Sequence, residues 1–276
     1  MAAALCSCSN EDYLGGHFVT DGAGHKMELT AQISASTTPT LQFAEGDKIA
    51  VTTGYVDVSS LNRFYTCQAD GKSFTPDTNV PVYIKGNTQI VAYMPIIGND
   101  GGEPAIALNT SDQTDITDYL FAKSEQVGIE TSAVTLNFDH AYGQMQLNLV
   151  IPDGETIIGY RLSGFIQTAD VDPYTLDITL AEASADITGS GTDIKNITFT
   201  LIPQTVSDDA VIPASIVLVG KKRSYTVALG TVEIGAGKVT TASVDLTNGV
   251  GTVEFASEGG RWSDAGIGGN ISSEEK

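Results

Sequence analysis

The stretch AVTLNFDHAYGQMQLNLVIP, residues 133–152, carries the clearest structural signal in the chain. Apolar side chains occupy every second position from 134 to 138, and a histidine continues that face at position 140. This alternation is typical of a β-strand that buries one face and exposes the other. A second alternating run, residues 145–151, follows the dipeptide Tyr142-Gly143. We therefore expect a hairpin-like unit that bends at this dipeptide.

Short alternating runs also fill the rest of the chain from Lys26 onward. KMELTAQIS, residues 26–34, alternates cleanly, and the turn signals Asp70-Gly71 and Gly86-Asn87 each separate two strand-like runs. No helical pattern of ten or more residues with capping residues is present. Evenly spaced short strands without helices between them predict an all-β protein made of antiparallel β-sandwiches.

The length of 276 residues suits two β domains better than one. Pro152-Asp153-Gly154 interrupts the alternation, and we place a domain boundary there. The predicted organisation is a leader and flexible tether over residues 1–25 and an N-terminal β-sandwich over residues 26–152. A C-terminal β-sandwich then covers residues 153–276 and ends in a Gly-rich, acidic tail.

The charge of the chain excludes one class of partner. Fourteen basic residues against 34 acidic ones give a formal net charge of -20. Nucleic acid and anionic lipid headgroups would repel such a chain, so neither is expected to bind it directly. No apolar run is long enough for a membrane-spanning helix. Of the three cysteines, Cys6 and Cys8 are too close to close a useful loop, which excludes a disulfide scaffold.

The N-terminal residues MAAALCSCSNED resemble the lipobox of bacterial lipoproteins, with Cys8 as the acylated residue. The acidic run after it, residues 9–12, resembles the signal that exports lipoproteins of gut Bacteroidetes to the outer face of the outer membrane. A complete signal peptide needs a basic region and an apolar region of roughly 7–15 residues, and only four residues precede Leu5. We interpret residues 1–25 as a truncated lipoprotein signal and tether. The alternative is an ordinary flexible terminus that contains two cysteines.

A series of short elements in sequence order resembles the fimbrillin-like lipoproteins of Bacteroidetes over most of the chain. After the lipobox come F-x-x-G-D-x-I-x-V at residues 43–51, A-Y-x-P at 92–95, D-Y-L-F-A at 118–122, L-x-F-x-H-A at 136–141, F-x-L-x-P at 199–203 and W-S-D at 262–264. Each element is weak alone, whereas the order of all of them is specific to that superfamily.

This resemblance implies two tandem transthyretin-like β-sandwiches, export as a lipoprotein, and assembly by strand donation between subunits. A sandwich that lacks one strand leaves backbone groups unpaired and an apolar groove open, and a strand from another subunit satisfies both. Residues 27–33 resemble the N-terminal strand that stalk subunits lose on maturation, and residues 251–256 with the tail are a candidate donor. For each segment the alternative is an ordinary strand that completes its own domain.

One departure from the family pattern concerns maturation. Stalk subunits of the best-known relatives are cut by an Arg-specific protease after the first strand, whereas the first arginine of this chain is Arg63. That position favours an accessory, tip or anchor protein, or a different processing protease.

Residues that carry catalysis or bind metals are not grouped in this sequence. There is no G-x-S-x-G elbow and no HExxH pattern, so we expect no enzyme activity, no cofactor and no metal site. His17 and His25 lie in the tether, whereas His140 continues an apolar face and is expected to be a buried core histidine. Cys67 is expected to be a small buried apolar residue.

Acidic residues gather at 112–118, 170–172 and 208–209. Calcium takes six to eight oxygen ligands, and no EF-hand or nonapeptide spacing is present. We interpret these groups as solvated loops, with bound calcium as the alternative.

The leading hypothesis is therefore a cell-surface fimbrial subunit or an accessory, tip or anchor protein that acts in adhesion. Its expected partners are other fimbrial subunits, the outer membrane through a lipid on Cys8, and ligands on host or bacterial surfaces. The alternative is a surface glycan-binding lipoprotein of a polysaccharide-uptake system, which would need exposed aromatic platforms. The single tryptophan, Trp262, lies in the tail and speaks against it. A secreted hydrolase would need paired carboxylates on neighbouring strands, and nothing selects such a pair.

Overall fold

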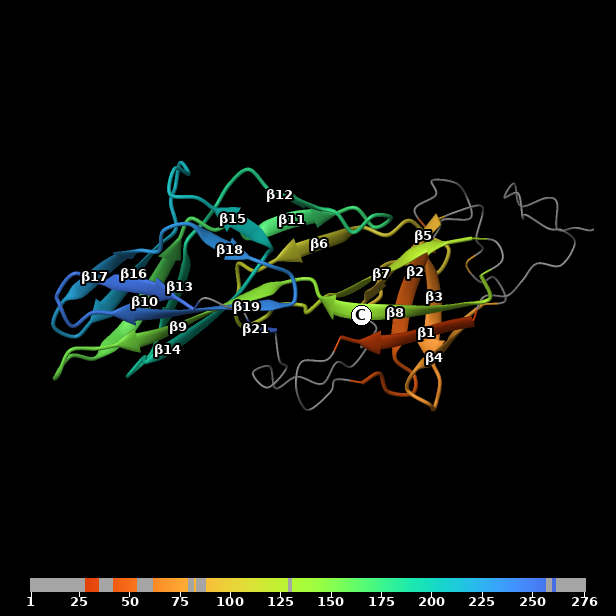
Figure 1. The fold of residues 1–276 in the computed structure, drawn as a ribbon, viewed down its shortest axis with the longest axis horizontal. Helices are drawn as coiled ribbons and strands as arrows, with labels where there is room; N and C mark the ends of the chain where they lie inside the picture. Colours follow the sequence, from red (N-terminus) through yellow and green to blue (C-terminus); the bar gives the residue numbers. More distant parts are fainter. Residues whose placement is uncertain are drawn as a thin grey trace, which may run out of the picture.

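The computed structural model describes residues 28–34, 42–53, 62–78, 82, 88–128, 131–256 and 260–261. Within these residues every regular element is a strand, which confirms the predicted all-β class. The strands form an elongated molecule, with the N-terminal half at one end and the C-terminal half at the other (Figure 1). In the part of the chain that the structure describes, no helix has the length and apolar composition needed to span a membrane.

The N-terminal half is a closed β-barrel of seven strands in the order β1-β4-β3-β2-β5-β7-β8. Its interior is filled by apolar side chains such as Ile49, Met94, Leu136 and Phe138, all of which are fully buried. The barrel strands are β1 (Glu28–Ile33), β2 (Lys48–Thr53), β3 (Arg63–Cys67), β4 (Ser73–Pro76), β5 (Thr88–Met94), β7 (Leu120–Val127) and β8 (Ala133–His140).

The hairpin predicted around Asp70-Gly71 is confirmed. Cys67 of β3 faces Phe74 of β4 in an antiparallel ladder. The Asp70 carboxylate accepts hydrogen bonds from the backbone N–H groups of Lys72 and Ser73, at 2.9 and 2.7 Å. Gly71 has a φ of +68°, which explains the glycine at this turn. The turn predicted at Gly86-Asn87 lies outside the described residues.

Two strands of the barrel are buried on both faces. On β2, Ile49 and Val51 face the barrel interior, while Ala50 faces outward and is still fully buried. On β5, the side chains of Val91 and Tyr93 also face outward and are fully buried. Another layer therefore covers this side of the barrel, which explains why these strands read as continuous apolar runs rather than as alternating ones.

That covering layer is a small sheet shared by the two halves. In it β11 (Thr168–Val171) pairs with both β12 (Ile178–Leu180) and β6 (Ile106–Asn109). Ala169 and Val171 of β11 belong to one apolar cluster with Val91 and Tyr93 of the barrel. We call this cluster the junction core, because its members come from both halves of the chain.

The C-terminal half is a β-sandwich. The sheet β13-β10-β16-β17 packs against the sheet β14-β9-β19-β20, and a single apolar cluster that includes Phe199 and Leu218 lies between them. The strands of these sheets are β9 (Gly143–Val150), β10 (Ile157–Ser163), β13 (Ile187–Ser190), β14 (Asn196–Leu201), β16 (Ser215–Gly220), β17 (Ser224–Ala228), β19 (Lys238–Asp245) and β20 (Thr252–Phe255). The short pair β15 (Gln204–Val206) and β18 (Val232–Ile234), and β21 (Gly260–Arg261) on β19, complete the half.

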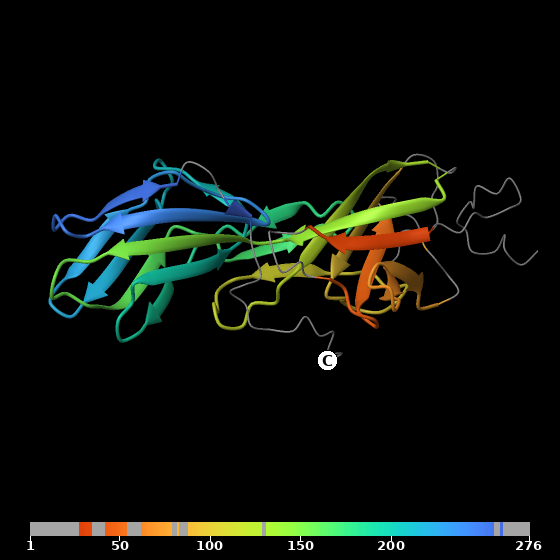
Figure 2. The ribbon, with the colours of Figure 1, turned by 60° about the horizontal axis from the view of Figure 1, so that its bottom comes forward.

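The predicted hairpin over residues 133–152 is wrong. β8 pairs with β1 and β7 in the barrel, whereas β9 pairs with β14 and β19 in the sandwich. The two strands follow each other along the long axis and link the two halves, as two views show (Figures 1 and 2). A period of two defines a strand face, but it does not determine whether the chain folds back or continues. The division into domains at residue 152 stays a prediction. Strand β9 precedes that residue, and it pairs with β14 and β19, which follow it.

The expected antiparallel arrangement holds for all described ladders except two. β1 runs parallel to β8, and β19 runs parallel to β9. Parallel neighbours need a long crossover connection, and about 100 residues separate the partners in both pairs. Alternation within a single strand carries no information about the direction of a partner so far away in the sequence.

Candidate assembly site

Strand β1 closes the barrel, and it is the first described strand of the chain. It pairs with β8 at six successive positions, from Glu28 with Ala133 to Ile33 with Phe138. On its other side it pairs with β4, where Leu29 faces Phe74. Figure 2 shows β1 lying along β8 on the side of the barrel. Both edges of β1 are therefore hydrogen-bonded within the same chain, as an ordinary completing strand would be.

The two faces of β1 have different contacts. Leu29, Ala31 and Ile33 are buried in the barrel core, as their alternation predicted. On the outer face, Thr30 shares a hydrogen bond of 2.9 Å between its Oγ1 and that of Thr135. In the same row, Gln32 Nε2 donates to Asn137 Oδ1 at 2.7 Å. This polar ladder was not predicted from the sequence, although both strands carry alternating polar residues.

Aromatic side chains form the part of the core that β1 covers. The Phe43 ring lies edge-on to the rings of Phe74 and Phe138, with centroid distances of 5.1 and 5.4 Å. Phe74 and Phe138 are also the ladder partners of Leu29 and Ile33. Without β1, the edges of β4 and β8 would border an apolar groove with an aromatic lining.

Strand β20 lies within residues 251–256, the first part of the C-terminal candidate donor, and the tail lies largely outside the described residues. Among the described strands β20 pairs with β19 alone, from Thr252 with Asp245 to Phe255 with Ala242, and it forms an edge of the described sheet. Val253 and Phe255 are half-buried against the sandwich core. β20 thus completes its own sheet in this structure, with less burial than β1.

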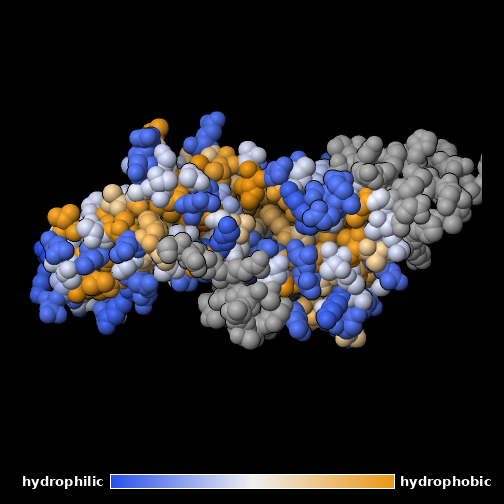
Figure 3. All heavy atoms as spheres, viewed as in Figure 1, coloured by the Kyte–Doolittle hydropathy of each residue, from blue (hydrophilic) through white to orange (hydrophobic). Residues whose placement is uncertain are grey.

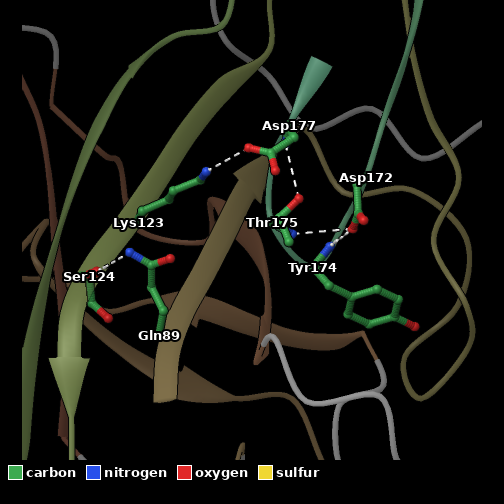
Figure 4. A network of polar contacts seen from close by, with 7 residues as sticks. All are labelled: Gln89, Lys123, Ser124, Asp172, Tyr174, Thr175 and Asp177. Atoms are coloured by element: carbon green, nitrogen blue, oxygen red, sulfur yellow. Dashed lines mark hydrogen bonds and ion pairs between the residues drawn. The ribbon is translucent and has the colours of Figure 1, made fainter. Parts of the chain in front are cut away.

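The junction between the halves is held by the hairpin of β11 and β12, whose tip reaches the barrel (Figure 4). The Asp172 carboxylate caps this tip by accepting hydrogen bonds from the backbone N–H groups of Tyr174 and Thr175. Leu176 then adopts a left-handed conformation with a φ of +56° and is buried in the junction core. Asp177 forms an ion pair with Lys123 of β7, with Nζ and Oδ1 3.3 Å apart. Hydrogen bonds from Thr175 and Lys123 lower the pKa of Asp177.

The buried histidine and cysteine are placed as predicted. His140 is buried, and its Nδ1 lies 2.9 and 3.0 Å from the two carboxylate oxygens of Asp118. Asp118 precedes the strand β7 that pairs with the end of β8, so this contact ties two barrel strands together. Cys67 is buried in the barrel core, and burial, followed by nearby carboxylates, raises the pKa of its thiol to about 11. An un-ionised, buried thiol is a poor nucleophile.

Two carboxylates of the acidic loops, those of Asp112 and Asp172, are engaged in local turns. Asp112 Oδ1 accepts hydrogen bonds from the backbone N–H and the hydroxyl of Thr114, which lower its pKa. Asp172 caps the junction hairpin in the same manner. Among the described residues, no group of three or more His, Cys, Asp or Glu side chains has the arrangement of a metal site.

Aromatic platforms for a glycan are likewise missing from the described surface. Every described Phe and Tyr side chain is buried or half-buried. A small cavity of about 210 Å³ contains Tyr119 and Tyr142 in its wall, yet both rings are packed in the junction core. Among the described residues, therefore, no Phe or Tyr ring is fully exposed. Trp262 lies outside the described residues, as do Cys8, His17 and His25.

Comparison with known proteins agrees with this architecture. A protein-family model described as fimbrillin-like matches residues 34–262. A candidate cell adhesion protein from Bacteroides ovatus has a similar structure, with a TM-score of 0.64 and 19% sequence identity over 87% of this chain and 99% of that one. A second candidate cell adhesion protein, from Bacteroides uniformis, gives a TM-score of 0.58 at 18% identity over 86% and 97% of the two chains. No curated protein sequence matches the chain.

At such identities the two structures show a shared fold. The family match begins directly after β1 and extends past β21, so it includes every described strand except β1. This chain is a member of the fimbrillin-like family.

Proposed function

We propose that this chain is a cell-surface fimbrial subunit, or an accessory, tip or anchor protein of a fimbria, which assembles by exchange of a β-strand. Membership of the fimbrillin-like family supports a role with other fimbrial subunits. The observation that carries the finer proposal is the position of β1, the first described strand, which is inserted between β4 and β8. In this role the chain acts through its backbone and core rather than through catalytic side chains.

The chemistry of the β1 site suits an exchange of strands. The site offers two rows of backbone donors and acceptors, and it takes apolar side chains at alternate positions. Burying a Leu or Ile side chain stabilises a structure by about 1.5–3 kcal/mol, so two such residues per strand give a substantial gain. An incoming strand from a second subunit would make the same contacts as β1.

The anchoring part of the proposal rests on the sequence. A lipid on Cys8, at about 0.8 kcal/mol per buried CH₂, would hold the chain at the outer membrane. Because no arginine precedes Arg63, β1 would stay in place unless another protease removes it. A chain that keeps β1 is suited to a terminal position, where it donates a strand without accepting one, whereas a chain that loses β1 can accept a strand at the vacated site.

Electron microscopy of intact cells tests the proposed role. The full-length gene would be expressed in a Bacteroidetes host as wild type and as Cys8→Ala, with antibody labelling on the cell surface. We expect label on filaments or at their bases, and its release from the cell in the variant. Even label over a surface without filaments would instead favour the glycan-binding lipoprotein, and label confined to the cell interior would contradict both roles.

A further inference from the structure

A polar cavity of about 210 Å³ lies at the edge of the junction core, and no residue of β1 takes part in it. Its wall is formed by β6, by the loop between β6 and β7, and by Tyr119 and Tyr142, which precede β7 and β9. On the face that Figure 3 shows, apolar and hydrophilic side chains are interspersed over both halves of the molecule. A hollow with a few convergent polar groups is a better candidate for a ligand site than such a mixed surface.

The Tyr119 hydroxyl is a buried polar group that lacks a partner. The side chain lines the cavity and is 9% exposed. Among the described residues nothing forms a hydrogen bond with this hydroxyl, and burial is the one cause that raises the pKa of the group. The neighbouring Tyr142 hydroxyl, by contrast, accepts from the backbone N–H of Asn109 at 3.4 Å. A buried polar atom without a partner is costly, so we expect the cavity to receive a hydrogen-bonding ligand.

Two carboxylates line the same cavity, whereas none of the described residues in its wall is basic. Asp112 and Asp115 lie in one turn, in which the Asp115 N–H donates to the Asp112 carbonyl at 3.3 Å. Thr114 occupies Oδ1 of Asp112 through two hydrogen bonds, so Oδ2 stays available. Within the described residues the Asp115 carboxylate has neither a hydrogen bond nor an ion pair. The negative charge of this turn is therefore not balanced at the cavity.

The loop that carries the two carboxylates is fixed to both halves of the molecule. Gln113 pairs with strand β14 of the sandwich, because its Oε1 accepts from the Thr200 N–H at 2.9 Å and its Nε2 donates to the Thr200 carbonyl at 3.0 Å. At the other end of the loop, Asp118 contacts His140 of the barrel. A loop held at both ends keeps its side chains in a fixed arrangement, which lowers the entropy that is lost when a ligand binds.

We propose that this cavity binds the ammonium group of a primary amine, with Asp112, Asp115 and Tyr119 as the acceptors. An ammonium group has three N–H donors and no acceptor, which matches three acceptor side chains. The carboxylates supply two charge-assisted hydrogen bonds, and the phenolic oxygen supplies the third. Calcium fits less well, because it takes roughly six to eight oxygen ligands and the described residues contain no group of three or more metal-ligating side chains.

The size of the cavity limits the rest of the ligand. A cavity of about 150 Å³ holds benzene, so 210 Å³ leaves room for an ammonium group on a chain of about four carbons. Ala107 and the Tyr142 ring give this chain an apolar wall. Because Asp112 and Asp115 are exposed, we expect weak binding, in the millimolar range, which the net charge of -20 assists by attracting cations. This site goes beyond the proposed strand exchange and does not depend on it.

Nuclear magnetic resonance titration of the isotope-labelled, full-length chain with n-butylamine tests this binding. We expect saturable shifts of the amides between Asn109 and Tyr119 and no such shifts with n-butanol, which has the same chain without the charge. A short peptide with one lysine distinguishes two sources of the amine. Binding of the peptide as tight as that of the free amine would assign the lysine side chain of a protein, and binding of the free amine alone would assign a small molecule.

Three variants test the named acceptors. Tyr119→Phe removes the hydroxyl and keeps the ring, so we expect it to weaken binding several-fold without changing the free energy of unfolding. Asp115→Asn removes one charge at nearly constant shape, and we expect it to weaken binding about tenfold. Asp153→Asn is the matched control, because it makes the same change of charge at an exposed turn of the sandwich that does not line the cavity.

Four results would overturn the proposal. Absence of saturable binding would remove the site, and equal shifts with n-butanol would show that the cavity does not select a cation. An equal loss of binding in Asp153→Asn would show an effect of net charge alone. Displacement of the amine by calcium at the same amides, at lower concentration than the amine itself requires, would assign a metal site instead.

Discussion

The barrel and the sandwich are completed in different ways. In the barrel the hydrogen bonds run through a closed ring, and one strand of that ring, β1, comes from the start of the described chain. In the sandwich the edge strand β20 has β19 as its one partner among the described strands, and its residues are at most half-buried. Removing a strand from a closed ring creates two open edges, whereas removing an edge strand only moves the edge inward. The barrel is therefore the half whose closure depends on a single strand, β1, which is the strand that we propose is exchanged.

The largest expected effects come from emptying either core. Phe138 in the barrel and Phe199 in the sandwich are both fully buried. We expect Phe138→Ala and Phe199→Ala each to lower the free energy of unfolding by about 3–5 kcal/mol. Hydrogen exchange should rise in β1, β4 and β8 for the first variant and in β14 and β16 for the second. Identical exchange patterns would contradict the separation of the two cores.

A smaller effect distinguishes β1 from the edge strand β20. Leu29 in β1 is buried, so Leu29→Ala should cost about 2–4 kcal/mol in urea unfolding. Val253 in β20 is half-buried, and we expect Val253→Ala to cost less than about 1 kcal/mol. Equal losses for the two substitutions would show that β20 is anchored as firmly as β1.

Leu176 connects the two halves through the junction core. We expect Leu176→Ala to cost about 2 kcal/mol, near the lower end for a buried leucine at the edge of a core. Solution scattering should also show a wider range of orientations between barrel and sandwich. Leu176→Gly is the matched variant, because glycine adopts the φ of +56° without strain. The difference between the two variants therefore separates the loss of packing from the effect of backbone strain. An unchanged scattering curve for both variants would mean that the junction does not depend on this side chain.

The raised pKa of the buried Cys67 thiol predicts that the stability of the barrel depends on pH. Because burial raises the thiol pKa from 9.0 to about 11, the unfolded state loses this proton at a lower pH than the folded state. The stabilising contribution is thus complete below pH 9 and falls as the pH rises toward 11. Under reducing conditions, the stability advantage of wild type over Cys67→Ala should shrink between pH 8 and pH 10. An advantage that stays constant would contradict this account.

The smallest effect is expected at the exposed ion pair of the junction. The Lys123 and Asp177 side chains are 38% and 76% exposed. Exposed pairs contribute about 0–1 kcal/mol, so Lys123→Ala should shift the free energy of unfolding by less than about 0.5 kcal/mol. A loss of stability as large as that of Leu176→Ala would show that the ion pair, and not the buried Leu176 side chain, is the main contact of the junction.

Local features of the fold were predictable from the sequence, whereas long-range features were not. Alternation predicted which faces of β1 and β8 are buried, and the dipeptide Asp70-Gly71 predicted a turn. The apolar neighbours of His140 in the sequence predicted that it is buried. The parallel pairing of β1 with β8 depends on a partner about 100 residues away, which no local pattern encodes. Leu176 was missed because leucine gives no signal for a left-handed turn, and its burial is decided by the other half of the chain.

The central claim is that β1 fills an exchangeable position in the barrel. A specific protease site placed between β1 and β2 would allow β1 to be released under mild denaturation, and hydrogen exchange of β4 and β8 would be followed. The account predicts that their amides lose protection and regain it when a peptide of residues 26–34 is added. The same peptide with Leu29→Asp and Ile33→Asp should fail to restore it. Amides of β8 that stay protected without β1, or equal protection by the two peptides, would contradict the claim.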